Sequence, residues 1–134
     1  MEKLSKQEAK RLSPGALAFY GDSVYELCVR RKVLSLGDRP SAVLHNMSVK
    51  MARASFQAAG YDKLAGTLSE EEADILRRGR NATGLNAPKS SSSAEYHKAT
   101  AVEALFGYLS LTGNETRIEE LFGIITDENE DVKG

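Results

Sequence analysis

Three acidic residues occupy positions where an ordinary packed helix would carry neutral ones. Asp22 follows Gly21 in the middle of a long apolar-periodic segment, where glycine and aspartate both weaken a helix. Glu26 comes four residues later, so its carboxylate shares a helix face with that of Asp22. Glu103 is the only acid within residues 99–112. Carboxylate oxygens suit Mg²⁺ or Mn²⁺, which predicts a cation site between two helices; a solvated or arginine-paired acid cluster is the alternative.

The elements that must position these acids are predicted to be helices along the whole chain. Alternating strand-type runs are scarce, whereas Ala, Leu, Glu, Lys and Arg are plentiful. Ser13-Pro14 and the Ser69 capping box are typical helix starts, and Gly60 is interpreted as a helix stop. The predicted helices are 3–11, 14–34, 40–59, 70–80, 94–112 and 115–126. We therefore expect an all-α fold in one domain over residues 1–126, followed by an acidic tail over 127–134.

Apolar residues at helical spacing predict which helix faces form the core. Gly107 lies one turn after Glu103, where it would let another helix approach closely. The predicted core positions are Leu17, Tyr20, Val24, Leu27 and Cys28 in the second helix, Val102, Leu105, Phe106 and Leu109 in the fifth, and Ile118, Leu121, Phe122 and Ile125 in the last.

Composition and charge restrict the classes of protein that fit the chain. Its 134 residues are 41% hydrophobic and 28% charged, the balance of one globular domain. Short apolar runs, a charged N-terminus and a single cysteine predict no membrane span, no secretory signal and a cytoplasmic location. The net charge of −1 hides two basic blocks: residues 27–53 carry six basic and one acidic residue, and 77–98 carry five and one. These blocks form either a polyanion site or two solvated helix faces.

Two stretches resemble the signatures of the ribonuclease III family. Residues 17–27, LAFYGDSVYEL, are similar to its core motif, and 99–109, ATAVEALFGYL, are similar to its second acidic motif. Residues 78–82, RGRNA, resemble the basic stretch that precedes that motif, and the likeness spans about residues 13–126. Ala18 and Thr100 stand where the family has acids. The short length and the segments GDSVYEL and YHKATAVEALFGYL resemble the single-domain Mini-ribonuclease III subfamily, which lacks a double-stranded-RNA-binding domain.

The resemblance implies a fold and an activity for the chain. It implies the helical ribonuclease III endonuclease fold and a homodimer that cleaves double-stranded RNA, leaving 5′-phosphates and 3′-hydroxyls. The cofactor implied is Mg²⁺, for which Mn²⁺ substitutes. The subfamily matures the ends of the large-subunit (23S) ribosomal RNA precursor, so that precursor is the expected substrate and ribosomal proteins are candidate helpers. Asp22 and Glu103 are the expected catalytic metal ligands, with Glu26 as a third candidate ligand.

Further positions are predicted to contact RNA or the second copy of the chain. Phe19 and Tyr20 are expected to contribute to the dimer interface. Thr100 either holds a water in the metal site or is an ordinary helix residue. The candidate RNA-binding residues are Arg77, Arg78, Arg80, Asn81, Lys89, Ser91 and His97.

Two other functions remain open at this point. The missing acids at Ala18 and Thr100 allow a catalytically inactive module that binds RNA in ribosome assembly. A metal phosphohydrolase acting on small nucleotides is disfavoured, because such sites use His–Asp ligand pairs and neither of the two histidines adjoins an aspartate.

Overall fold

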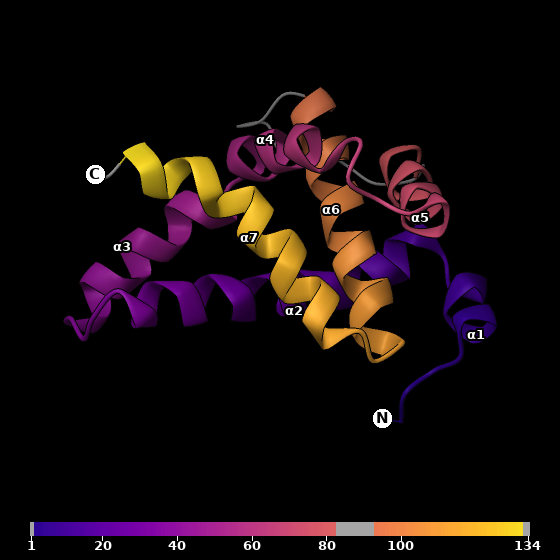
Figure 1. The fold of residues 1–134 in the computed structure, drawn as a ribbon, viewed down its shortest axis with the longest axis horizontal. Coiled ribbons are helices and arrows are strands. Elements are labelled where there is room, and N and C mark those ends of the chain that lie inside the picture. The colour runs from indigo at the N-terminus through magenta and orange to yellow at the C-terminus, as the bar shows by residue number, and fades with distance from the viewer. Residues whose placement is uncertain (1, 83–92, 133–134) are drawn as a thin grey trace.

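The computed structural model describes residues 2–82 and 93–132, with side chains up to residue 127, and in these ranges the chain forms helices joined by short connections. The predicted all-α class is thereby confirmed (Figure 1). None of the helices in these ranges is long and apolar enough to cross a membrane. The elements are α1 (Lys6–Arg11), α2 (Pro14–Ser35), α3 (Ser41–Ala52), α4 (Ala54–Leu64), α5 (Glu70–Arg80), α6 (Ser93–Leu111) and α7 (Glu115–Val132).

Local capping explains why three of these helices begin where they do. The Ser13 hydroxyl accepts a hydrogen bond from the backbone N–H of Ala16, and Pro14 occupies the first helical position. Ser69 and Glu72 form a reciprocal capping box that begins α5, as predicted. Ser5 caps α1 in the same manner, so this helix begins at Lys6 rather than at residue 3.

The predicted single helix over residues 40–59 is wrong. The chain adopts an extended conformation at Arg53, which ends α3 and begins α4 without a side-chain cap. Gly60 does not stop the helix but lies inside α4, where an added Cβ would lie 3.0 Å from the Ile125 side chain. This glycine therefore serves the packing of α4 against α7 rather than a helix end. The last helix also continues to Val132, past the predicted end at residue 126.

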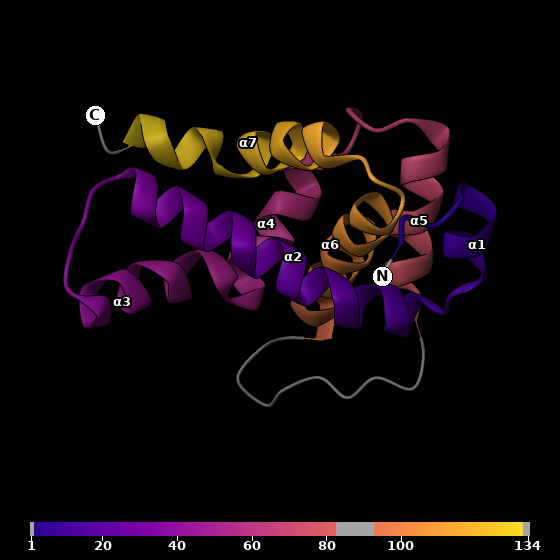
Figure 2. The ribbon, with the colours of Figure 1, turned by 90° about the horizontal axis from the view of Figure 1, so that it is seen from below.

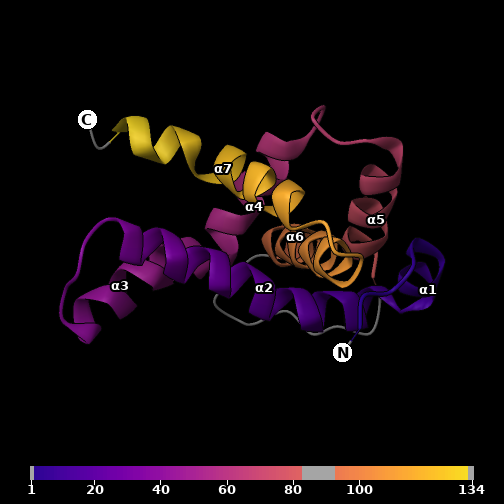
Figure 3. The same ribbon diagram turned by 60° about the horizontal axis from the view of Figure 1, so that its bottom comes forward.

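Helix α6 is the centre of the molecule. Most of its residues between Ala99 and Leu111 are buried, and α2, α4 and α5 make the most extensive contacts with it. Figures 2 and 3 show α6 nearly end-on, with α2 crossing it and α3 folding back beside α2. The Tyr25 ring of α2 packs 5.5 Å from the Phe106 ring and 5.6 Å from the Phe122 ring, measured between centroids. The core thus forms around this one helix.

The buried face of α2 differs from the predicted one. Tyr20 is 38% exposed and Leu27 is 50% exposed, so these two positions do not belong to the core. Cys28 is only partly buried, and that burial raises the pKa of its thiol to about 11. Helix α2 contacts α6 at Gly21, so the helix face that contains Gly21 is buried. The buried residues on this face recur at every fourth position. The stripe consists of Leu17, Gly21, Tyr25, Val29 and Val33.

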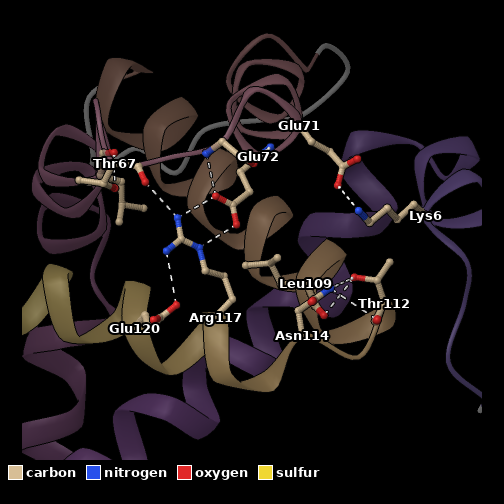
Figure 4. A network of polar contacts seen from close by, with 11 residues as sticks. Lys6, Thr67, Glu71, Glu72, Leu109, Thr112, Asn114, Arg117 and Glu120 are labelled. Carbon is tan, nitrogen blue, oxygen red and sulfur yellow. Dashed lines mark hydrogen bonds and ion pairs between the residues drawn. The ribbon is translucent and has the colours of Figure 1, made fainter.

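A partly buried ion pair connects α7 to the start of α5. Arg117 donates from Nε and Nη2 to the two carboxylate oxygens of Glu72, each at 2.8 Å (Figure 4). Its Nη2 also donates to the backbone oxygen of Thr67 at 3.0 Å. The hydrogen bond from Arg117 lowers the pKa of Glu72, so the capping carboxylate stays ionised.

Candidate active site

Two glycines bring the backbones of α2 and α6 into direct contact. A Cβ added at Gly21 would lie 1.6 Å from the backbone oxygen of Glu103, and one added at Gly107 would lie 2.1 Å from that of Leu17. The close approach predicted for Gly107 is confirmed. Asp22 directly follows Gly21, and Gly21 contacts the backbone of Glu103. The helix crossing therefore places the two acids close together.

The two acids line a common cleft at this crossing. The cleft has a volume of about 250 Å³. Asp22 is exposed at its rim, whereas Glu103 is partly buried. The residues that line it are Gly15, Ala18, Phe19, Asp22, Tyr96, Thr100 and Glu103. Ala18 and Thr100 stand where the motif that the sequence resembles has acids. Both residues line the same cleft as Asp22 and Glu103.

Electrostatics at this cleft favour a bound cation. Burial raises the pKa of Glu103 to about 8, and the nearby charge of Asp22 and a hydrogen bond between the two carboxyl groups act in the same direction. A hydrogen bond with the Gln57 side chain opposes this rise. A divalent ion bound here would relieve the repulsion that Asp22 exerts on Glu103 and would favour the ionised form of Glu103. Within the described ranges no three or more acidic, histidine or cysteine side chains gather as possible metal ligands, and the acids that line this cleft are Asp22 and Glu103.

The raised pKa of Glu103 predicts how the metal-free protein responds to pH. Below about pH 4.5 the side chain is protonated in both the folded and unfolded states. Between 4.5 and about 8 the unfolded chain loses the proton and the folded protein keeps it, so stability falls as the pH rises. Above about 8 the destabilisation is complete.

Glu103→Gln should therefore stabilise the metal-free protein, and increasingly so at higher pH. We expect little difference from wild type at pH 5 and a gain of about 2 kcal/mol at pH 9, since screening by solvent reduces the full linkage energy. Urea unfolding in EDTA across this pH range measures the difference. A gain that is independent of pH would contradict the raised pKa.

Glu26 is paired with a basic residue and does not line the cleft that Asp22 and Glu103 share. Its Oε1 accepts a hydrogen bond from Arg30 Nε at 3.1 Å. A separate cleft of about 570 Å³ is lined by Glu26 together with Asp22, Phe19, Tyr20 and Ser23. The structure thus shows the arginine-paired alternative for this carboxylate, and its role as a metal ligand stays a prediction.

Thr100 faces the cleft but uses its hydroxyl locally. The residue is 4% exposed, and its Oγ1 donates to the backbone oxygen of Tyr96 at 2.9 Å. This is the back-bonding of an ordinary helix threonine. Thr100 also lines the cleft of Asp22 and Glu103, and a role in holding water in the metal site stays a prediction.

Several candidate RNA-binding residues gather at the beginning of α2. Arg77, Arg78 and Asn81 line a cleft of about 510 Å³ with Ser13, Pro14 and Gly15. Arg78 Nη2 donates to the backbone oxygen of Leu12 at 3.3 Å, and Arg77 forms an ion pair with Asp74. Gly15 also lines the acidic cleft, so the two clefts adjoin.

The other candidates are less closely tied to this surface. Arg80 is exposed at the end of α5. His97 is partly buried, with its ring 5.9 Å from that of Tyr96 and its Nδ1 buried without a hydrogen-bond partner. Lys89 and Ser91 lie outside the described residues.

Sequence reasoning missed Gln57, a buried polar residue whose side chain affects the pKa of Glu103. This residue is 4% exposed in α4, and its Nε2 donates to the backbone oxygen of Ala52 at 2.9 Å. A glutamine inside an ordinary helical run carries no local pattern that would single it out. Its burial depends on the break at Arg53, which the sequence did not predict.

Fold and site together define a small all-helical protein in which two carboxylates meet in a cleft at a glycine-lined helix crossing. The Ribonuclease III domain matches residues 15–114, which include both carboxylates and both glycines. The chain belongs to the ribonuclease III family, and it is an endoribonuclease.

Similar proteins extend over most of the chain. The Mini-ribonuclease 3 of Thermoanaerobacter sp. (strain X514) is 42% identical over 120 residues, which cover 90% of this chain and 84% of the relative. The Mini-ribonuclease 3 of Symbiobacterium thermophilum is 42% identical over 116 residues, or 87% of this chain and 89% of the relative. The crystal structure of protein FN1578 from Fusobacterium nucleatum matches with a TM-score of 0.82 and 30% identity, covering 91% of this chain and 94% of that one.

Proposed function

We propose that the protein is a Mg²⁺-dependent endoribonuclease that cleaves double-stranded RNA as a cytoplasmic homodimer, and that its substrate is the 23S ribosomal RNA precursor. The main support for metal-dependent chemistry is that Asp22 and Glu103 line the same cleft. The likeness to Mini-ribonuclease 3 proteins over most of the chain supports the choice of substrate.

The two carboxylates have complementary surroundings for holding the ion. Asp22 is exposed at the rim, where a phosphodiester can approach, and Glu103 lies deeper, where the lower dielectric strengthens its attraction for a cation. When bound, Mg²⁺ supplies Lewis-acid activation of the phosphate and of the attacking water; Mn²⁺ supplies the same chemistry. As in the family that the chain belongs to, water would attack the phosphorus and the P–O3′ bond would break, which leaves a 5′-phosphate and a 3′-hydroxyl.

The cleft that adjoins the acidic pair supplies contacts for an RNA backbone. Arg77 and Arg78 offer cationic donors to phosphates, and the Asn81 amide offers hydrogen bonds to sugar or phosphate. Duplex RNA is recognised mostly by shape, phosphates and 2′-hydroxyls, which such groups serve well. A strand lying along this surface would pass from the basic cleft to the acidic pair over Gly15.

An exposed apolar face of α2 supports the homodimer. Phe19 is 83% exposed beside the cleft, and Leu27 and Leu34 are 50% and 59% exposed further along the helix. Large apolar side chains in this number favour burial against another surface. A two-fold dimer also provides one cleft for each strand of a duplex.

One preparation of the protein tests the activity and the assembly together. At micromolar concentration it should sediment as a dimer, cut both strands of a duplex RNA with Mg²⁺ or Mn²⁺, and cut neither strand in EDTA. A 23S precursor end should be cut at a defined position. A protein that binds several duplexes and cuts none of them would favour the inactive RNA-binding module instead, and a monomer would contradict the dimer.

A further inference from the structure

Gly79 is a buried glycine in the last turn of α5, the helix that carries the arginines of the basic cleft (the cleft lined by Arg77, Arg78 and Asn81). It lies directly between Arg78 and Arg80. Glycine inside a helix is less favourable than alanine, so its presence needs a cause. Its φ is not positive, so the backbone conformation does not require glycine here.

Close packing against α6 explains why this position has no side chain. A Cβ added at Gly79 would lie 2.9 Å from Ala101 Cα and 2.9 Å from Ala104 Cβ, which is closer than Cβ atoms approach their neighbours in folded proteins. Since Ala101 Cα belongs to the backbone, no side-chain rotation would make room, and α5 would have to move away from α6. The glycine therefore fixes how closely the two helices pack.

The two alanines that Gly79 contacts are neighbours of residues in the acidic cleft. Ala101 directly follows Thr100, and Ala104 directly follows Glu103. Both Thr100 and Glu103 line the acidic cleft. Residues 100–104 of α6 thus line this cleft and also form the contact with α5.

A second contact holds α5 against the beginning of α2. Arg78 Nη2 donates to the backbone oxygen of Leu12 at 3.3 Å, directly before the Ser13 cap of α2. Gly15, in the first turn of α2, lines both the basic and the acidic cleft. The position of α5 on α6 therefore sets the spacing between the two clefts.

We propose that Gly79 is a positioning residue: its contact with Ala101 and Ala104 sets the spacing at which one duplex RNA reaches the basic cleft and the acidic cleft together. The inference rests on the proposed function for the identity of that ligand. Misplacing reacting groups by about 1 Å can cost about 10²-fold in rate, so the spacing matters even when each cleft is intact.

Linkage between metal binding and RNA binding tests the proposal without using activity. Ca²⁺ is the probe because it takes oxygen ligands in a flexible geometry, and gel electrophoresis confirms that the duplex stays intact. If one RNA spans both clefts in the wild type, saturating Ca²⁺ should tighten duplex binding about tenfold. In Gly79→Ala we expect this factor to fall below about threefold, because the added methyl separates the clefts.

Three further measurements distinguish misplacement from general damage to the protein. Duplex affinity without metal and Ca²⁺ affinity without RNA should each stay within about threefold of wild type in Gly79→Ala, since both clefts keep their residues. With Mg²⁺, kcat should fall about tenfold while KM changes less than about threefold.

Gly60→Ala is the matched control. Gly60 is also a buried helical glycine, an added Cβ would lie 3.0 Å from the Ile125 side chain, and it lines neither cleft. This variant should keep the Ca²⁺ linkage and kcat within about twofold of wild type, because it leaves the contact between α5 and α6 unchanged.

A compensating substitution gives a second test. Gly79→Ala/Ala104→Gly removes one of the two groups that the new methyl would meet, so the double variant should recover at least about threefold of the lost kcat. Glycine within α6 lowers helix stability, so greater stability would not explain such a recovery.

The possible outcomes separate this proposal from the proposed function. Wild-type linkage in Gly79→Ala, an equal loss in Gly60→Ala, or a double variant with no recovery would overturn the positioning role. A wild type without linkage would overturn it as well, and so would a Gly79→Ala protein that does not fold, since the glycine would then be a requirement of the fold. If the linkage is present in the wild type and lost in Gly79→Ala, but the wild type cuts no duplex RNA with Mg²⁺ or Mn²⁺, the positioning role stands and the nuclease function fails.

Discussion

Asp22→Asn and Glu103→Gln should each lower cleavage of duplex RNA by at least about 10³-fold, the scale of losing several kcal/mol of metal-ion catalysis. Each substitution replaces an anionic ligand by a neutral group of the same shape, so the fold persists while the cation is lost. The basic surface around Arg77 and Arg78 is untouched in both variants. We therefore expect the affinity for duplex RNA, measured at one fixed salt concentration, to stay within about threefold of wild type.

Two other acids give this experiment its controls. Glu119→Gln removes an exposed carboxylate from α7 and should cut RNA at the wild-type rate. Glu26→Gln decides the open role of that residue: a loss comparable to that of Asp22→Asn would make it a ligand, and a small effect would leave it a partner of Arg30. If either variant of the central pair keeps more than about a tenth of the activity, the two-carboxylate site is not the catalytic one.

Gly21→Ala should destabilise the protein more than an alanine introduced at any open helical position. The new methyl would lie 1.6 Å from the Glu103 backbone oxygen, so α2 and α6 would have to separate. We expect a loss of about 3 kcal/mol or more in the free energy of unfolding, beyond the small gain that alanine brings to a helix. Such a loss is a large part of the stability of a small domain, and separation of the helices would also move Asp22 away from Glu103.

Gly123→Ala is the matched substitution. Gly123 lies inside α7, and an added Cβ there would meet nothing within 4 Å. Alanine at this position should therefore stabilise the protein by about 0.5–1 kcal/mol through its higher helix propensity. Urea unfolding of both variants measures the contrast. A Gly21→Ala protein within about 1 kcal/mol of wild type would show that the two helices do not need the contact.

The sequence alone was sufficient for features whose causes lie within a few residues. The Ser13-Pro14 and Ser69 caps determine where α2 and α5 begin, because a side-chain oxygen satisfies a backbone N–H only two or three residues away. The pair Gly21-Asp22 also stood out locally because both residues are unfavourable inside a helix, and Glu103 stood out as the only acid in an apolar run. Together with the two family-like motifs, they were enough to predict the helical class and the acidic pair.

Only the tertiary structure decided which faces and side chains meet. The buried stripe of α2 follows Gly21 rather than Tyr20 and Leu27, because its contact with α6 sets the rotation of the helix. The break at Arg53 has no side-chain cap and no adjacent proline, and α4, with its buried Gln57, begins at this break. Such features depend on packing between segments far apart in the chain, and packing energy overrides the weak local preferences from which a sequence is read.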